Sequence, residues 1–141
     1  MRAPAIVLLV LAASPAAADN VRVKACFDLR SNAEQRDCAQ AIYRDASKEL
    51  DELVRRKLDE ADAPDNTPPQ KLGAAPRKQS LHDAIAASQK AWEAYRDAEC
   101  WGVAGRPGGS GSFTWGFGCA AEKTLQRIEE VKGAVLSEMK R

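Results

Sequence analysis

The chain has 141 residues, 21 of them basic and 20 acidic, which gives a formal net charge of +1 at pH 7. A chain so close to neutrality has no field that would attract nucleic acid or an anionic membrane, so neither is a predicted partner. Its length suits one domain with a modest hydrophobic core and leaves no room for a second.

Residues 1–18 have the pattern of a secretory signal peptide. A single basic residue precedes an apolar run, and a proline and three alanines then lead to a predicted cleavage site after Ala18. The apolar run is shorter than the roughly 20 residues that a membrane helix needs. The first cysteine, Cys26, lies well beyond that site, whereas a lipoprotein carries a cysteine at the cleavage point. We therefore expect residues 19–141 to form a single periplasmic or secreted domain without membrane insertion.

The first predicted helix begins at a capping box formed by Ser31 and Glu34, in which the serine oxygen accepts the backbone N–H of Glu34 and the carboxylate reaches back. Downstream, apolar residues recur at steps of three and four, so one face is apolar and the other is solvated. These residues are Ile42, Ala46, Leu50, Leu53, Val54, Leu58 and Ala61. The pattern ends before Pro64.

Residues 62–79 are rich in proline, which predicts an interhelical loop. Ser80 then predicts the N-cap of a second helix that runs to about Cys100. Its helical wheel places Trp92 and Tyr95 in the middle of the apolar stripe. We expect both rings in the core, and the alternative is a platform for a ligand.

Residues 102–118 hold seven of the nine glycines, which predicts an irregular loop. A third helix follows and continues to the C-terminus, with apolar residues at Ala121, Leu125, Ile128, Val131, Val135 and Met139. No strand alternation is present. The predicted fold is therefore all-α, a small antiparallel bundle of about three main helices.

Three polar side chains lie within or beside the apolar stripes. The aliphatic part of the Arg96 side chain must lie over apolar surface, and its guanidinium needs acceptors. We therefore expect an ion pair, with Glu99 one turn away as the nearest candidate. Thr124 falls inside the stripe of the third helix, where a buried threonine usually bonds a backbone carbonyl. Arg127 lies at the edge of the same stripe.

The chain has four cysteines, which are Cys26, Cys38, Cys100 and Cys119. An even number in an oxidising compartment predicts two disulfides, and antiparallel packing places all four residues at one end of the bundle. Three pairings are possible. We favour the local pairs, first with second and third with fourth, because each closes a short segment. A four-cysteine zinc site is the alternative, but no C-x-x-C pair is present.

Catalytic motifs are not found in this sequence. The single histidine, His82, is predicted to be a surface residue, and no nucleophile elbow, phosphate loop or metal-binding cluster is present. Asp97 and Glu99 lie two apart on a helix and point in different directions, so they cannot flank a glycosidic bond. We predict a non-enzymatic protein with no cofactor and no metal.

Two motifs resemble the lysozyme-inhibitor LprI-like N-terminal domain family of secreted bacterial domains. The first is W-x-x-Y-R-D-x-x-C, and the second, after the glycine-rich segment, is C-x4-T-x2-R. Together they comprise Trp92, Tyr95, Arg96, Asp97, Cys100, Cys119, Thr124 and Arg127. The chain departs from the family pattern at Leu50-Asp51 and at Val54. The resemblance implies a small helical domain that binds a protein, with lysozyme as the possible partner.

If the activity extends to this chain, the resemblance implies that a loop occludes a glycan-cleaving cleft, which holds two carboxylates. The candidate residues of that loop are Arg106, Ser110, Ser112, Trp115 and Phe117. The two aromatic rings either anchor a partner or fold back on the bundle, and the flanking glycines favour folding back. The alternative function is a structural or interaction module of the periplasm with another partner, because a neutral chain lacks the acidic field that would steer it to a basic lysozyme.

Overall fold

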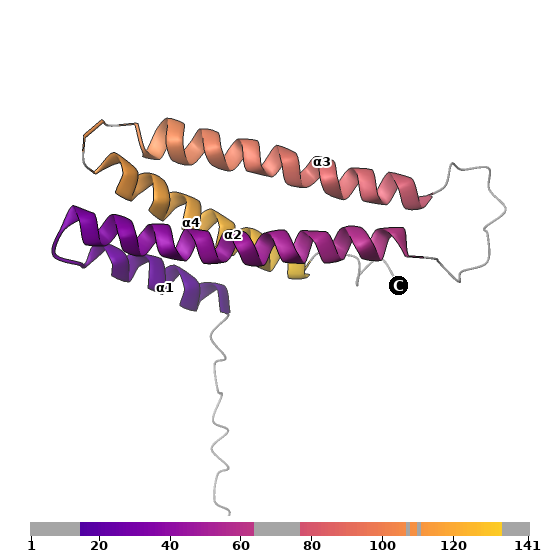
Figure 1. The fold of residues 1–141 in the computed structure, drawn as a ribbon, viewed down its shortest axis with the longest axis horizontal. Coiled ribbons are helices and arrows are strands. Elements are labelled where there is room, and N and C mark those ends of the chain that lie inside the picture. The colour runs from indigo at the N-terminus through magenta and orange to yellow at the C-terminus, as the bar shows by residue number, and fades with distance from the viewer. Residues whose placement is uncertain (1–14, 64–76, 107, 110, 134–141) are drawn as a thin grey trace, which may run out of the picture.

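The computed structural model describes residues 15–63, 77–106, 108–109 and 111–133. Its elements in chain order are α1 (Pro15–Phe27), α2 (Asn32–Asp62), α3 (Arg77–Asp97), the π-helical segment η1 (Ala98–Ala104) and α4 (Ser112–Gly133). No strand occurs in these ranges. The long helices α2, α3 and α4 run side by side and α1 lies along one end of them (Figure 1). The all-α bundle predicted from the sequence is confirmed, with one helix more than the three expected.

The start of α2 has the predicted capping box. The Ser31 hydroxyl oxygen accepts the backbone N–H of Glu34 at 3.2 Å, and the Glu34 carboxylate accepts the backbone N–H of Ser31 at 3.0 Å. The helix ends at Asp62, and Ala63 is already extended. An extended residue before a proline is the conformation that steric contact with the proline ring favours.

The core lies mainly between α2 and α4 and is completed by α1. Its buried residues are Val23, Ala46, Leu50, Leu53, Ala121, Leu125 and Ile128. Val23 is fully buried although it belongs to α1, the helix that the sequence analysis did not predict. The short α1 is therefore part of the folded domain and closes the α2–α4 seam.

The second predicted helix differs from the structure in two ways. It begins at Arg77, so Ser80 lies within the first turn instead of capping it, and residues 64–76 of the predicted proline-rich loop lie outside the described residues. Tyr95 was expected in the core, and this was wrong, because the residue is 54 % exposed. Trp92 is half-buried and does pack against the core.

The glycine-rich segment also differs from its predicted form. The π-helical segment continues to Ala104 and α4 begins at Ser112, so the irregular loop predicted over 102–118 is shorter than expected at both ends. Gly116 lies inside α4, where a Cβ atom would overlap the ring of Trp101. The many glycines of this segment predict a flexible backbone, but the role of Gly116 is to leave room for the Trp101 ring. Gly109, at φ 113°, does require a conformation that favours glycine.

Both disulfides have the local pairing that the sequence favoured. Cys26 is bonded to Cys38, which joins α1 to α2, and Cys100 is bonded to Cys119, which joins η1 to α4. The two bonds lie at the same end of the bundle, where α1 meets α2 and α3 meets α4 (Figure 1). This end is called the disulfide end below. Two structural disulfides are typical of proteins from oxidising compartments.

Candidate binding surface at the disulfide end

Exposed apolar side chains are concentrated on η1 and the start of α4. In the described part of the chain eight large hydrophobic residues are exposed, and four of them belong to these two segments, with exposed fractions between 36 and 63 %. The four are Trp101, Val103, Phe113 and Trp115. They are called the tip below. Exposed apolar surface on one part of a small domain commonly marks a contact site for another molecule.

Trp115 is exposed but held in place. Its indole packs against the ring of Phe27 with centroids 4.9 Å apart and planes tilted by 30°. Its other neighbour is Gly111, whose missing Cβ atom would lie 3.8 Å from the indole nitrogen. The ring is therefore in contact with α1 on one side and open to solvent on another.

Phe117 is half-buried and points toward the bundle. Its ring lies 6.2 Å from that of Tyr43 on α2 and meets the Trp101 ring edge-on at 4.9 Å. These contacts support Trp101, which in turn rests on Gly116. Two aromatic residues were proposed from the sequence as anchors. Of these, Trp115 is exposed to solvent, whereas Phe117 packs on the inner side of the tip against Trp101.

The polar candidates of the predicted loop differ in their surroundings. Arg106 is exposed in the turn before α4, and the hydroxyl of Ser112, the first residue of that helix, donates to the carbonyl of Gly109 at 2.9 Å. Ser110 lies outside the described residues. Arg106 is the one charged residue in the sequence between Glu99 and Glu122. The tip therefore combines four exposed apolar side chains with a single cation.

The sequence analysis missed Trp101, Val103 and Phe113 as exposed candidates. Nothing in their local sequence distinguishes them from core residues, since all three lie beside or within the glycine-rich segment that was expected to be irregular. The α1 residue Phe27, which supports Trp115, was also missed, because the sequence analysis did not predict α1.

Arg96 occupies an aromatic environment between α2 and α3. Its guanidinium carbon lies 5.1 Å from the centroid of Trp92 and 5.5 Å from that of Tyr43. The expected ion pair is present, but its acid is Asp97 at 2.8 Å, so the assignment to Glu99 was wrong. The α-helix ends at Asp97 and Glu99 belongs to η1, where the wider π-helical turn changes the one-turn alignment.

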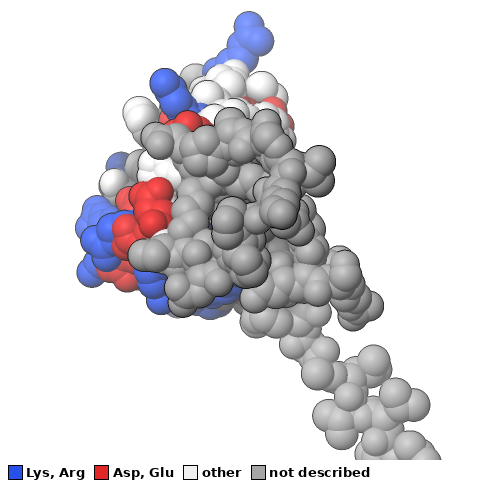
Figure 2. Space-filling view, turned by 90° about the vertical axis from the view of Figure 1, so that its right-hand side faces the viewer, with Lys and Arg blue, Asp and Glu red and all other residues white. Residues whose placement is uncertain are grey.

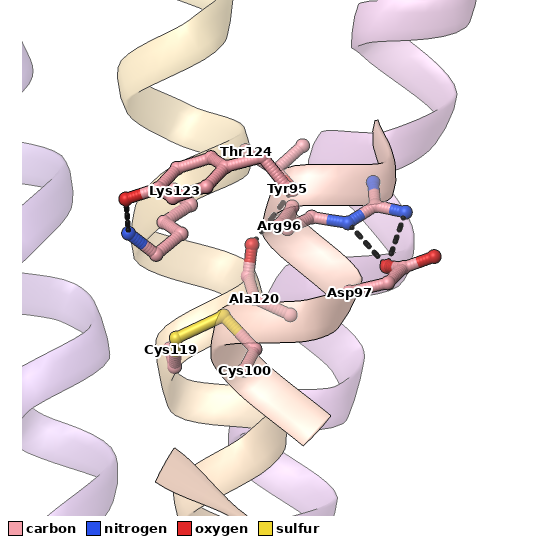
Figure 3. Close-up of a disulfide and its surroundings, with 8 residues drawn as sticks. All are labelled: Tyr95, Arg96, Asp97, Cys100, Cys119, Ala120, Lys123 and Thr124. Carbon is pink, nitrogen blue, oxygen red and sulfur yellow. Dashed lines mark hydrogen bonds and ion pairs between the residues drawn. A yellow bond between two sulfur atoms is a disulfide. The ribbon is translucent and has the colours of Figure 1, made fainter. Parts of the chain in front are cut away.

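Tyr95 and Arg96 leave α3 in opposite directions (Figure 3). Lys123 on α4 donates to the Tyr95 hydroxyl at 3.0 Å and its ammonium lies 4.6 Å from the ring centroid. The Cys100–Cys119 bond lies close by and joins η1 to α4 (Figure 3). Tyr95 is thus a surface link between α3 and α4 and not a core residue.

The two polar residues of the family motif on α4 have structural contacts. Thr124 is fully buried and donates to the carbonyl of Ala120 at 2.7 Å, as predicted. Arg127 reaches Ser88 on α3 at 3.1 Å and Glu130 on its own helix at 3.2 Å. The bond to Ser88 holds α4 against α3 away from the disulfide end.

Titratable groups are scattered over the surface. His82 lies 3.6 Å from Asp62 and 3.7 Å from Asp83, which links the start of α3 to the end of α2. In the ranges that the structure describes, no three histidine, cysteine or acidic residues are placed to hold a metal ion. None of the described helices is long and apolar enough to cross a membrane. Viewed from the end opposite the disulfides, basic and acidic side chains lie next to each other (Figure 2).

Comparison with protein families identifies this scaffold. A family model described as "Lysozyme inhibitor LprI" matches residues 26–131, a range that begins at the first disulfide cysteine and includes both sequence motifs. Searches of curated proteins and of solved structures give no match. The matched range covers most of the chain, and the protein therefore belongs to the LprI lysozyme-inhibitor family.

Proposed function

We propose that this protein is an exported, non-enzymatic binding protein of the bacterial cell envelope that inhibits lysozyme through its disulfide end. The observation that carries the proposal is the tip, whose four exposed apolar side chains lie close to Arg106. The two segments that carry them, η1 and the start of α4, are joined by the Cys100–Cys119 bond. Family membership supplies the class of partner. The signal-peptide pattern of residues 1–18 and the two disulfides support export.

The proposed mechanism is occlusion of the catalytic cleft. A lysozyme cleft contains two carboxylates that flank the scissile bond. Arg106 would pair with an acid of that cleft, and Phe113 and Trp115 would supply the apolar anchors that dominate the energetics of most interfaces. The fixed position of Trp115 on Phe27 limits the entropy that binding costs.

The second candidate function is an interaction module of the periplasm with another protein partner. One observation favours it, namely the balance of charge. The sequence has 21 basic and 20 acidic residues, so it lacks the acidic field that would draw it toward a basic lysozyme. Both candidates use the tip, and they differ in the partner.

A lysis assay separates the two functions. The oxidised protein in micromolar excess is added to bacterial cells and lysozyme, and the fall in turbidity is followed. We expect slower lysis with the wild type and loss of the effect in Phe113→Ala and Arg106→Ala. Leu81→Ala is the matched control, because Leu81 is exposed on α3 far from the disulfide end.

Undiminished lysis at micromolar wild-type protein would contradict the inhibitor function. The test of the second candidate is then whether a partner is captured from envelope extract by the wild type and lost with the Phe113→Ala variant.

A further inference from the structure

The groove between α1 and α4 is a second feature of the disulfide end. It encloses about 410 Å³, and its lining includes Lys24, Phe27, Trp115, Gly118 and Glu122. This volume lies within the range of roughly 300–1,000 Å³ that is typical of small-molecule sites. The occlusion mechanism uses Trp115 of this lining as an anchor and gives no role to the charged residues of the groove, Lys24 and Glu122.

The groove has a rigid aromatic wall. Trp115 and Phe27 pack at 4.9 Å and leave the indole 58 % exposed. Phe27 fits against α4 because Gly118 has no side chain, and a Cβ atom there would lie 2.5 Å from the Phe27 ring. Cys119, which also lines the groove, ties the wall to η1. The exposed indole is therefore a preorganised flat surface.

Two charged residues of opposite sign line the groove. Lys24 comes from α1 and Glu122 from α4, and neither has an ion-pair or hydrogen-bond partner within the described residues. Their charges cancel, so the groove does not select an anion such as a phosphate or a lipid headgroup. They offer three N–H donors and a carboxylate acceptor to a neutral ligand.

We propose that this groove binds a short neutral saccharide. The C–H groups on one face of a pyranose carry partial positive charge and stack on the negative face of an indole, here Trp115. The hydroxyl groups of the sugar can accept from Lys24 and donate to Glu122. A ligand with one apolar face and many hydroxyls matches all three features of the groove at once.

The test uses the trimer of β-1,4-linked N-acetylglucosamine as the probe and contains no lysozyme. Titration of the oxidised protein is followed by tryptophan fluorescence, and by calorimetry as a second readout. We expect saturable binding that weakens at least tenfold in Trp115→Ala. Lys24→Met and Glu122→Gln should each weaken it about tenfold, as for hydrogen bonds to charged groups. Lys48→Met, an exposed α2 lysine far from the groove, is the control and should bind within twofold of the wild type.

The outcomes distinguish this inference from the proposed function. Binding of the trimer without inhibition of lysozyme supports the groove and contradicts the inhibitor. Absence of saturable binding overturns the saccharide proposal, as does equal binding by Lys24→Met, Glu122→Gln and the wild type. If the trimer does not bind but these two variants lose lysozyme binding, the groove belongs to a protein interface and the proposal is also overturned.

Discussion

At the scale of single residues, Arg96 shows how one side chain can join two helices. Its side chain is 12 % exposed, so most of its length lies over the rings of Trp92 and Tyr43. Its ion-pair partner Asp97 is 52 % exposed, and ion pairs of that kind contribute little because water screens them. The aromatic contacts should therefore contribute more to stability than the ion pair.

We predict that Arg96→Ala lowers the free energy of unfolding by about 1–3 kcal/mol, through lost stem packing and cation–π contact. Asp97→Ala should lower it by less than about 1 kcal/mol, because only the screened pair is lost. Urea denaturation of the oxidised proteins at pH 7, followed by circular dichroism, measures both values. Equal losses in the two variants would show that the ion pair is the main contribution.

The residues that surround Arg96 could be predicted only in part from the sequence. Helical spacing correctly placed Trp92 at the core and Arg96 at its border, since both depend on one regular helix. Tyr95 was misplaced because its exposure depends on Lys123 of another helix, and Glu99 was misassigned because α3 gives way to η1 before it. Local periodicity carries no information on either effect.

At the scale of elements, the close approach of η1 and α4 depends on glycine. Gly116 lets the Trp101 ring lie directly on the α4 backbone, and Phe117 then meets that ring edge-on. Glycine within a helix costs about 0.5–1 kcal/mol relative to alanine. That cost is offset here by the packing of two aromatic rings.

We predict that Gly116→Ala destabilises the protein by about 1–2 kcal/mol, since the displaced Trp101 loses more packing than the helix gains in propensity. Gly102→Ala is the matched control, because an added Cβ atom there meets nothing within 4 Å, and it should leave stability unchanged or slightly increased. Thermal denaturation gives the stability. Trp92 and Trp115 are present in wild type and variant alike, so the difference between their tryptophan emission spectra reports the displacement of the Trp101 ring. A Gly116→Ala variant as stable as the wild type, with unchanged emission, would contradict this account.

Elements were predictable where their signals are local. The capping box defined the start of α2, and the spacing of apolar residues identified the core faces of α2 and α4. The glycines of α4 were read as a loop, because glycine serves both backbone freedom and close packing and only the neighbouring ring decides which. For the same reason the exposed tip residues Val103 and Phe113 could not be identified from the sequence.

At the scale of the whole molecule, the balance of charge determines how a partner is approached. Residues 1–18 contain one charged residue, Arg2, so the predicted mature chain has 20 basic and 20 acidic residues. The charges of both signs are interspersed on the face seen in Figure 2. Association with a basic lysozyme would therefore rely on the apolar tip and on local pairing by Arg106, without long-range steering.

We predict that the dissociation constant for lysozyme changes less than about threefold between 50 and 300 mM NaCl, because the Debye length shortens over this range but no extended field is present to be screened. Arg106→Glu should weaken binding at least about tenfold, because it replaces an attractive contact with repulsion from the cleft carboxylates. Calorimetry at several salt concentrations measures the first effect, and Arg44→Glu, an exposed α2 arginine, controls for the change of net charge in the second. A steep loss of affinity with salt, or equal losses in the two charge variants, would show that the total charge and not the tip governs the association.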